Sequence, residues 1–161
     1  GQAFRHIVSG LDMQVHYSNR RRLPADLEAG AIYHDSVDDL LAHADFVSLH
    51  CPATPDTVNL IDERRLALMP KGAILVNTAR GNLIDEAALI SALRSGQLAA
   101  AGLDVFKTEP GGNAELAKLD NVFLLPHIGS ATRETRDAMG FRALDNLDAF
   151  FAGKAPHDRL V

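Results

Sequence analysis

The sequence predicts an α/β fold, with a doubly wound parallel sheet and helices on both of its faces. Short apolar runs typical of strands alternate along the chain with segments of helical periodicity. This alternation is typical of βαβ units, whose strands all run in one direction. Hydrophobic residues make up 47% of the 161 residues, which suffices for the packed core of one domain.

The first 50 residues are predicted to form two helices and two strands. Apolar residues at helical spacing indicate that the chain opens in a helix over residues 3–11, and a strand follows at residues 13–17. Ser36 is expected to cap a short helix whose first turn carries two acidic residues. Residues 46–49 are expected to form the next strand directly after that helix.

The central part of the chain is predicted to form a helix, a strand and a second helix. A loop with two prolines leads to a helical stretch near residues 63–69. The turn at residues 70–72 introduces an apolar strand at residues 73–77. Asp85 is expected to cap a helix with one apolar face, which stops at Gly96.

The last part of the chain is predicted to add two strands and a long helix. Apolar runs place the strands at residues 100–105 and 122–125. The helix is expected to run from about Ser130 to Ala152, and Gly153 ends it. Residues 154–161 are expected to be a polar tail.

Charge and composition exclude several classes of partner. A net charge of −5 and a pI near 5.7 argue against nucleic acid or an anionic membrane, because both require a basic surface. No apolar run reaches the roughly 20 residues that a bilayer requires. The single cysteine, Cys51, excludes an internal disulfide and favours a reducing compartment, so we expect a cytoplasmic protein.

Polar side chains lie at or just beyond the carboxyl ends of all five predicted strands. Ligands of open parallel sheets bind beyond the carboxyl ends of the strands, so these side chains indicate a site. They are Ser18 to Arg20, His50 to Pro52, Asn77 to Arg80, Asp104 and His127. Arg80 carries a permanent charge that is costly to desolvate without a partner. It is expected either to pair with Asp85 or Asp104, or to bind an anion from outside.

Three blocks, VNTARGNLIDEAAL, AAAGLDVFKTEP and LLPHIGSAT, resemble the signature blocks of the D-isomer-specific 2-hydroxyacid dehydrogenases, in particular the glyoxylate/hydroxypyruvate reductase branch. The resemblance implies a Rossmann-type domain that reduces a small 2-keto acid to the D-2-hydroxy acid. Arg80, Glu109 and His127 match the catalytic residues. His127 would donate a proton near neutral pH, Glu109 would fix its tautomer, and Arg80 would hold the substrate carboxylate.

The same resemblance implies a set of cofactor-binding positions. Asp104 matches a residue that hydrogen-bonds the nicotinamide carboxamide, although a strand cap is the alternative. Gly129 matches the segment that passes under the nicotinamide, while Ser130 beside it is either part of that segment or a helix cap. Thr57, at an expected helix start, either caps the helix or contacts the cofactor. The remaining predicted positions are Gly1, Cys51, Pro52, Thr78 and Ala79, with Cys51 expected to be a packing residue and not a nucleophile.

The segment after the strand at residues 13–17 predicts NADP as the cofactor, with NAD as the alternative. An acidic residue at this place accepts hydrogen bonds from the ribose of NAD, whereas arginine receives the 2′-phosphate of NADP. Here the sequence is Ser18-Asn19-Arg20-Arg21-Arg22, with no acidic residue before Asp26. Arg20 is the expected main phosphate ligand and Arg21 the second, with Ser18 and Asn19 donating hydrogen bonds. A solvated turn is the other interpretation.

Gly1 aligns with the third glycine of the family's G-x-G-x-x-G motif, so residues 1–161 are expected to be a single incomplete dinucleotide-binding domain. The first strand and the separate substrate domain would lie outside it. We therefore expect the pair of strands at residues 13–17 and 46–49 to be separated from the other three. The fragment alone is expected to be inactive.

The remaining expectations concern the oligomeric state and two alternatives to the enzymatic function. The resemblance implies a homodimer that pairs through the cofactor domain. The alternative function is a dinucleotide-sensing binding protein similar to a transcriptional co-repressor, because some relatives that resemble dehydrogenases act in this way. An inactive truncated product is a third interpretation.

Overall fold

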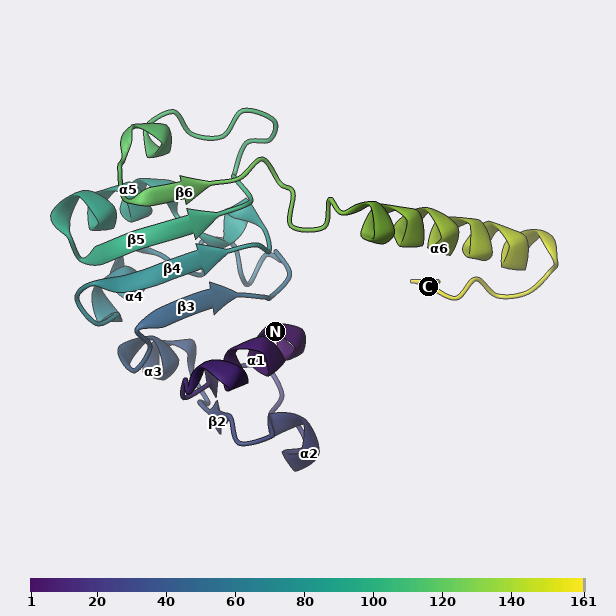
Figure 1. The fold of residues 1–161 in the computed structure, drawn as a ribbon, viewed down its shortest axis with the longest axis horizontal. Helices are drawn as coiled ribbons and strands as arrows, with labels where there is room; N and C mark the ends of the chain where they lie inside the picture. The colour runs from purple at the N-terminus through teal and green to yellow at the C-terminus, as the bar shows by residue number, and fades with distance from the viewer. Residues whose placement is uncertain (161) are drawn as a thin grey trace. The chain divides into compact units, whose positions relative to one another are not determined.

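We describe a computed structural model of the chain, which covers residues 1–160 (Figure 1). The chain forms two compact units, of which the first is Gly1–Pro126 and the second begins at His127. The first unit holds all the strands and the helices α1 to α5, and the second holds the long helix α6.

The strands of the first unit form two parallel sheets. One sheet has two strands, β1 and β2, and the other has four strands in the order β3-β4-β5-β6. Every neighbouring pair is parallel, which confirms the predicted α/β class. The strands are β1 His16–Tyr17, β2 Ile32–Tyr33, β3 Phe46–Leu49, β4 Ala73–Asn77, β5 Leu98–Leu103 and β6 Val122–Leu124.

The helices begin and end largely where local sequence signals place them. Ser36 accepts a hydrogen bond from the Asp39 N–H at the start of α3, and Asp85 accepts from two N–H groups at the start of α5. Gly96 ends α5 with a φ of +73°, a conformation that glycine adopts without strain. The helices are α1 Gln2–Val8, α2 Ala25–Glu28, α3 Val37–Ala42, α4 Glu63–Leu68, α5 Glu86–Ser95 and α6 Arg133–Phe151, with short 3-10 turns at Ser9–Leu11, Gly81–Leu83 and Leu116–Lys118.

One face of the four-stranded sheet is packed under helices. Helix α3 packs on α4, α4 packs on α5, and α5 packs on β5. Their apolar faces cover the side chains of alternate strand residues, such as Val47 on β3 and Leu75 on β4, which are buried. The opposite face is more open within residues 1–126, since Phe46 and Phe123 are exposed there. The buried core therefore lies on one side of this sheet.

The structure corrects two parts of the predicted topology. The strand expected at residues 13–17 is reduced to β1, and its partner is β2, which the sequence analysis missed together with α2. The strand at residues 46–49 pairs with β4 and not with residues 13–17. The sheet is thus interrupted between β1 and β3. This is where strand 1 of the order 3-2-1-4-5-6 belongs.

The second unit contains α6. The helix begins at Arg133 and not at Ser130, because Thr132 is the cap and its hydroxyl accepts a hydrogen bond from the Thr135 N–H. It ends at Phe151, and Gly153 follows with a φ of +71°. None of the helices within residues 1–160 is both long and apolar enough to cross a bilayer.

Candidate functional site

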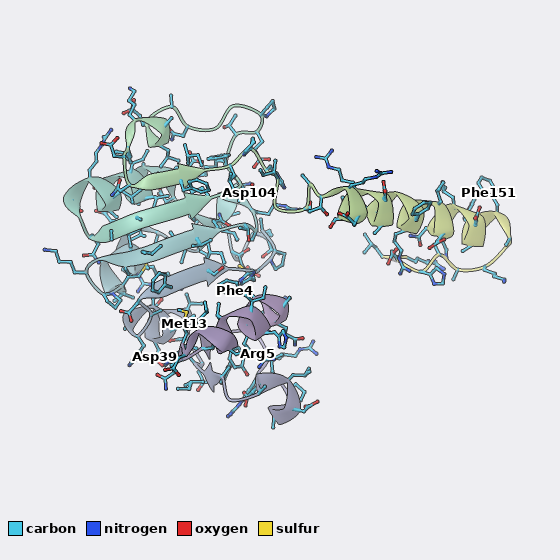
Figure 2. All side chains as sticks on the ribbon, viewed as in Figure 1. Phe4, Arg5, Met13, Asp39, Asp104 and Phe151 are labelled. Carbon is cyan, nitrogen blue, oxygen red and sulfur yellow. The ribbon has the colours of Figure 1, made fainter. Side chains whose placement is uncertain are left out.

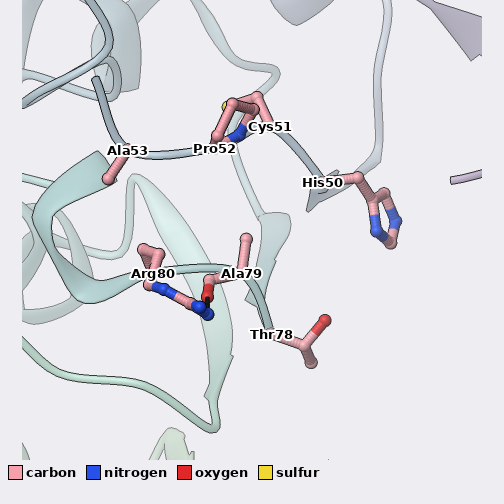
Figure 3. Close-up of a pocket in the computed structure, with 7 residues that line it drawn as sticks. All are labelled: His50, Cys51, Pro52, Ala53, Thr78, Ala79 and Arg80. Atoms are coloured by element: carbon pink, nitrogen blue, oxygen red, sulfur yellow. Dashed lines mark hydrogen bonds between the residues drawn. The ribbon is translucent and has the colours of Figure 1, made fainter. Parts of the chain in front are cut away.

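A hollow of about 470 Å³ lies at the carboxyl edge of the four-stranded sheet (Figure 3). The loops that follow the neighbouring parallel strands β3 and β4 form it. Its volume falls within the range of about 300–1,000 Å³ that is usual for small-molecule sites. The lining residues are His50, Cys51, Pro52, Ala53, Thr78, Ala79 and Arg80. The structure thus brings together Cys51, Pro52, Thr78, Ala79 and Arg80, all of which the sequence analysis selected.

Arg80 lies exposed at this hollow, and not desolvated at the edge of the core. Its Nη1 donates a hydrogen bond to the Ala79 carbonyl at 2.6 Å, drawn in Figure 3. Within residues 1–160 the guanidinium forms no ion pair, so neither Asp85 nor Asp104 neutralises it. Asp85 instead caps α5. Most of the five donors of this side chain are therefore available to an anion.

Asn77 fixes the loop that carries Arg80. The side chain of Asn77 is fully buried at the end of β4. Its Nδ2 donates to the Arg80 carbonyl at 2.9 Å, and its Oδ1 accepts from the Ala79 N–H at 3.0 Å. The sequence analysis included Asn77 among the polar strand ends but assigned it no role. The sequence signal that could have indicated this role is a polar residue at the end of an apolar strand, three positions before an arginine.

Gly81 allows the loop after β5 to lie directly against the loop after β4. A Cβ at position 81 would overlap the Phe106 carbonyl group and the Lys107 nitrogen, so only glycine fits without a backbone shift. Nearby, the Asp104 N–H donates to the Asn77 carbonyl at 3.0 Å. Asp104 is buried at the carboxyl end of β5 (Figure 2). The loops after β4 and β5 are therefore joined through their backbones.

Two glutamates hold the loop after β5. The carboxylate of Glu109 accepts a hydrogen bond from the Phe106 N–H at 2.8 Å. Glu86, in the first turn of α5, accepts from the Lys107 N–H at 2.9 Å and from Asn113 Nδ2 at 3.0 Å. The sequence analysis selected Glu109 and missed Glu86, because an acidic residue next to a helix cap is common on any surface.

The loop after β3 is held by Thr57. Its hydroxyl donates to the Pro52 carbonyl at 2.7 Å and accepts from the Thr54 N–H at 2.8 Å. Thr57 lies in a turn and not at a helix start, so the expected role as a helix cap is wrong. In the same loop Cys51 packs against the core, and burial raises the pKa of its thiol. A thiol of this kind is a poor nucleophile at neutral pH, as expected.

The segment after β1 contains one paired arginine and two unpaired ones. Arg22 binds Glu28 through two hydrogen bonds, from Nε at 2.7 Å and from Nη2 at 3.1 Å. Tyr17 donates to the same carboxylate at 2.5 Å, and the two donors lower the pKa of Glu28. Arg20 and Arg21 are exposed and form no ion pair within residues 1–160.

Further predicted positions lie near the first unit's amino end or in the second unit. Gly1 caps α1, and a Cβ added there would lie 3.8 Å from Cβ of His50, beside the hollow. Ser18 is half-buried, and Asn19 accepts a hydrogen bond from the Arg20 N–H at 3.1 Å. His127, with a φ of +56°, and Gly129 belong to the second unit, so their roles stay predictions.

The sequence of residues 1–129 matches the family described as "D-isomer specific 2-hydroxyacid dehydrogenase, NAD binding domain". The match includes the first two signature blocks, the third as far as Gly129, and both loops of the hollow. The chain belongs to this family. The resemblance noted in the sequence is therefore confirmed, as is the Rossmann-type fold.

Relatives and solved structures agree with this membership. The chain is 49% identical over 157 residues to a glyoxylate reductase from Thermococcus litoralis, which covers 97% of this chain and 47% of that protein. It is 43% identical over 155 residues to a glycerate dehydrogenase from Hyphomicrobium methylovorum, covering 95% and 48% respectively. The crystal structure of an NADPH-dependent glyoxylate/hydroxypyruvate reductase from Sinorhizobium meliloti, in complex with NADP and malonate, matches with a TM-score of 0.89 at 34% identity.

That structural match covers 94% of this chain and 46% of the other. The chain thus spans about half the length of the relatives that it matches.

Proposed function

We propose that the intact protein reduces a small 2-keto acid, of the glyoxylate or hydroxypyruvate type, to the D-2-hydroxy acid with NADPH. The observation that carries this proposal is the guanidinium of Arg80, exposed at the hollow and without an internal ion pair among residues 1–160. A planar fork of donors suits a 2-keto acid, since it can bind the carboxylate and polarise the keto oxygen together. The relatives described as glyoxylate reductases support this substrate class.

The residues of the chain suit a nicotinamide dinucleotide. The hollow lies at the carboxyl edge of a parallel sheet, where Rossmann-type domains bind dinucleotides. Thr78 and Ala79 on one side and Cys51 and Pro52 on the other would face the cofactor, with Asp104 near the nicotinamide carboxamide and Gly129 under its ring. When bound, the nicotinamide supplies the hydride for the reduction.

The protein side chains would carry out the proton transfer and the positioning. Hydride addition to the carbonyl carbon breaks the C=O π bond, and the oxygen then takes a proton from the imidazolium of His127. Glu109 would hold the other ring nitrogen of His127 and favour its charged form. Arg80 would exchange its hydrogen bond to Ala79 for the substrate carboxylate. The separate substrate domain would complete the cleft, so residues 1–161 alone should have little activity.

Kinetics of the intact protein test this function. Wild-type protein should oxidise NADPH with glyoxylate or hydroxypyruvate, and His127→Ala should lower kcat by about 10²–10⁴-fold. Arg80→Lys should not restore the activity lost in Arg80→Ala, because lysine lacks the bidentate fork. Near-normal turnover by His127→Ala would refute the mechanism. Saturable NADPH binding without turnover of any 2-keto acid would favour the dinucleotide-sensing alternative.

The preference for NADP is supported by the charges after β1. Glu28 neutralises Arg22, which leaves Arg20 and Arg21 for a 2′-phosphate, and Ser18 and Asn19 can add hydrogen bonds. A hydrogen bond to a charged group contributes about 1.5–3 kcal/mol. Arg20→Ala should therefore weaken NADPH binding by about 10–100-fold and change NADH binding little.

Lys71→Ala is the matched control for this cofactor test. Lys71 is an exposed cation before the amino end of β4, at the opposite edge of the sheet from the hollow. Its removal should change the affinity for neither dinucleotide. Equal losses of NADPH and NADH affinity in Arg20→Ala, or tighter binding of NADH than of NADPH by the wild-type protein, would contradict the assignment.

We also propose a cytoplasmic homodimer. The free thiol of Cys51 suits a reducing compartment, and the family resemblance implies pairing through the cofactor domain. Sedimentation equilibrium of the intact protein should give twice the mass of one chain. A monomer at micromolar concentration would contradict the dimer.

A further inference from the structure

Three histidines and one aspartate meet beside the two-stranded sheet, in a region that the proposed reaction does not use. His16 lies on β1, His34 directly follows β2, and Asp39 and His43 lie one turn apart at α3. His34 is buried, whereas the side chains of Asp39 and His43 are 56% and 55% exposed. Asp39 is labelled in Figure 2. The cluster is therefore reachable from solvent on one side and enclosed on the other.

The atoms that converge are all potential metal ligands. One ring nitrogen each of His34 and His43 and one carboxylate oxygen of Asp39 lie within 4.8 Å of one another. His34 Nδ1 lies 2.5 Å from Asp39 Oδ2, and His43 Nδ1 lies 3.8 Å from Asp39 Oδ1. Ligand atoms around a tetrahedral Zn²⁺ lie about 3.3 Å apart, given bond lengths of about 2.0–2.1 Å. The two separations in the cluster fall on either side of this value.

The hydrogen bonds of His16 orient His34 toward such an ion. His16 Nε2 lies 3.0 Å from the carbonyl oxygen Oε1 of Gln14, so Nε2 carries the proton and donates it. When His16 is neutral, its Nδ1 accepts a hydrogen bond from His34 Nε2 at 2.7 Å. A neutral His34 then directs the lone pair of Nδ1 at the carboxylate of Asp39. At 2.5 Å these two atoms share a proton, and a Zn²⁺ ion that takes the place of this proton would need them to move about 3.3 Å apart.

His43 can complete the set of ligands. Its Nδ1 now lies 2.8 Å from the backbone carbonyl of Asp39, one turn earlier, and donates to it. Because the ring is more than half exposed, it can exchange this hydrogen bond for an ion at low cost. Two imidazoles and one carboxylate are typical ligands of Zn²⁺ and related ions, and a water would fill the fourth position.

We propose that His34, Asp39 and His43 bind a first-row transition-metal ion, with Zn²⁺ as the best fit, and that His16 supports His34 from the second ring nitrogen. Ligating histidines usually have their other nitrogen hydrogen-bonded in this way. The ion would join β2 to α3 and so stabilise the small sheet that carries the segment Ser18 to Arg21. This site is separate from the hollow and independent of the proposed reaction.

Titration of the intact protein with ZnCl₂ at neutral pH, followed by calorimetry, tests the proposal. One saturable site is expected, and Co²⁺ in its place should give the visible absorption of a four-coordinate complex. Asp39→Asn and His43→Ala should each weaken Zn²⁺ binding by at least about tenfold, and His16→Ala by about 10–100-fold. Both ligand variants change exposed side chains, so the fold should persist and NADPH binding should serve as the check.

His6→Ala is the control, since His6 is an exposed histidine on α1 outside the cluster and should leave the affinity unchanged. Zn²⁺ should also raise the melting temperature of the wild-type protein, and a chelator should reverse the rise. The proposal is overturned if no saturable Zn²⁺ binding occurs, or if Asp39→Asn and His43→Ala bind the ion as the wild type does. A proton found on His34 Nδ1 by NMR in protein that fails to bind Zn²⁺ would show a salt bridge only.

Discussion

The buried side chain of Asn77 is hydrogen-bonded to the backbone of Arg80: Nδ2 of Asn77 donates to the Arg80 carbonyl at 2.9 Å. Through Oδ1 the same side chain accepts a hydrogen bond from the Ala79 N–H. One side-chain amide therefore holds the backbone of two consecutive loop residues, Ala79 and Arg80. The position of the guanidinium at the hollow thus depends on a residue that does not line the hollow.

Asn77→Ala should loosen the Arg80 loop and leave the Ala79 N–H without its partner. An unsatisfied buried donor costs about 1–3 kcal/mol, so the melting temperature should fall. A displacement of about 1 Å at a positioning loop can cost about 100-fold in rate, so kcat/KM for the 2-keto acid should fall by about 10–100-fold. Kinetics and thermal unfolding of the intact protein measure both effects.

Asn77→Asp is the matched variant, because it keeps the acceptor for Ala79 but turns a buried carboxylate oxygen toward the Arg80 carbonyl. It should lower kcat/KM at least as far as Asn77→Ala does. An Asn77→Ala protein with wild-type kinetics would show that the loop holds its shape without this side chain.

Gly81→Ala should disturb the contact between the loops after β4 and β5. The added methyl group would overlap the Phe106 carbonyl, and rigid backbone cannot yield as a flexible side chain does. We expect a loss of about 3 kcal/mol in the free energy of unfolding, measured by urea denaturation. Reduced kcat should accompany it, since Arg80 is adjacent.

Gly140→Ala provides the control for glycine replacement. Gly140 lies within α6, and a Cβ there would meet no atom within 4 Å. This change should stabilise the protein by up to about 1 kcal/mol, because alanine favours the helix over glycine. If Gly81→Ala also failed to lower the free energy of unfolding, the close approach of the two loops would not constrain residue 81.

Asp38 should make stability depend on acid pH. Hydrogen bonds from Arg64 and Arg65 lower the pKa of Asp38 from 3.8 to about 2, and so join α3 to α4. A group whose pKa is lower in the folded state stabilises the fold above its unfolded pKa. This stabilisation should therefore be complete above about pH 5 and decline as the pH falls through 3.8 toward 2.

Melting temperatures measured across that acid range check the prediction. Asp38→Asn should lower the melting temperature at neutral pH and flatten its dependence on acid. Asp56→Asn, at an exposed acid in the loop after β3, should leave the profile unchanged. Parallel acid profiles for the wild type and Asp38→Asn would assign the acid sensitivity to other carboxylates.

Strong local signals made most of the fold predictable from sequence. The structure has the helix caps Ser36 and Asp85 and the helix end at Gly96 where the sequence places them. The two caps act through their own side chains, and Gly96 acts because it has no side chain. The strands β3 and β4 were predicted to the residue, since both are apolar runs bounded by turns. Strand β2 was missed because two residues give no measurable period.

The residues that line the site were predictable from sequence, but the residues that hold its loops in place were not. Arg80, Cys51 and Thr78 were selected as residues that follow strands, and they do line one hollow. Gly81 and Glu86 were missed, because their importance comes from backbone groups 21 to 26 positions away in sequence. Thr132 replaced Ser130 as the cap of α6, since two neighbouring hydroxyl residues give similar local signals.

The pairing of Arg22 with Glu28 sets the electrostatic capacity of the segment after β1. Of three consecutive guanidinium groups, one is already compensated, so the segment presents two net positive charges. A phosphate monoester carries between about one and a half and two negative charges at neutral pH. The two positive charges of the segment therefore balance the charge of one phosphate monoester. The affinity for the nucleotide should fall only slightly as the ionic strength rises, whereas the affinity of a surface that binds a polyanion falls steeply.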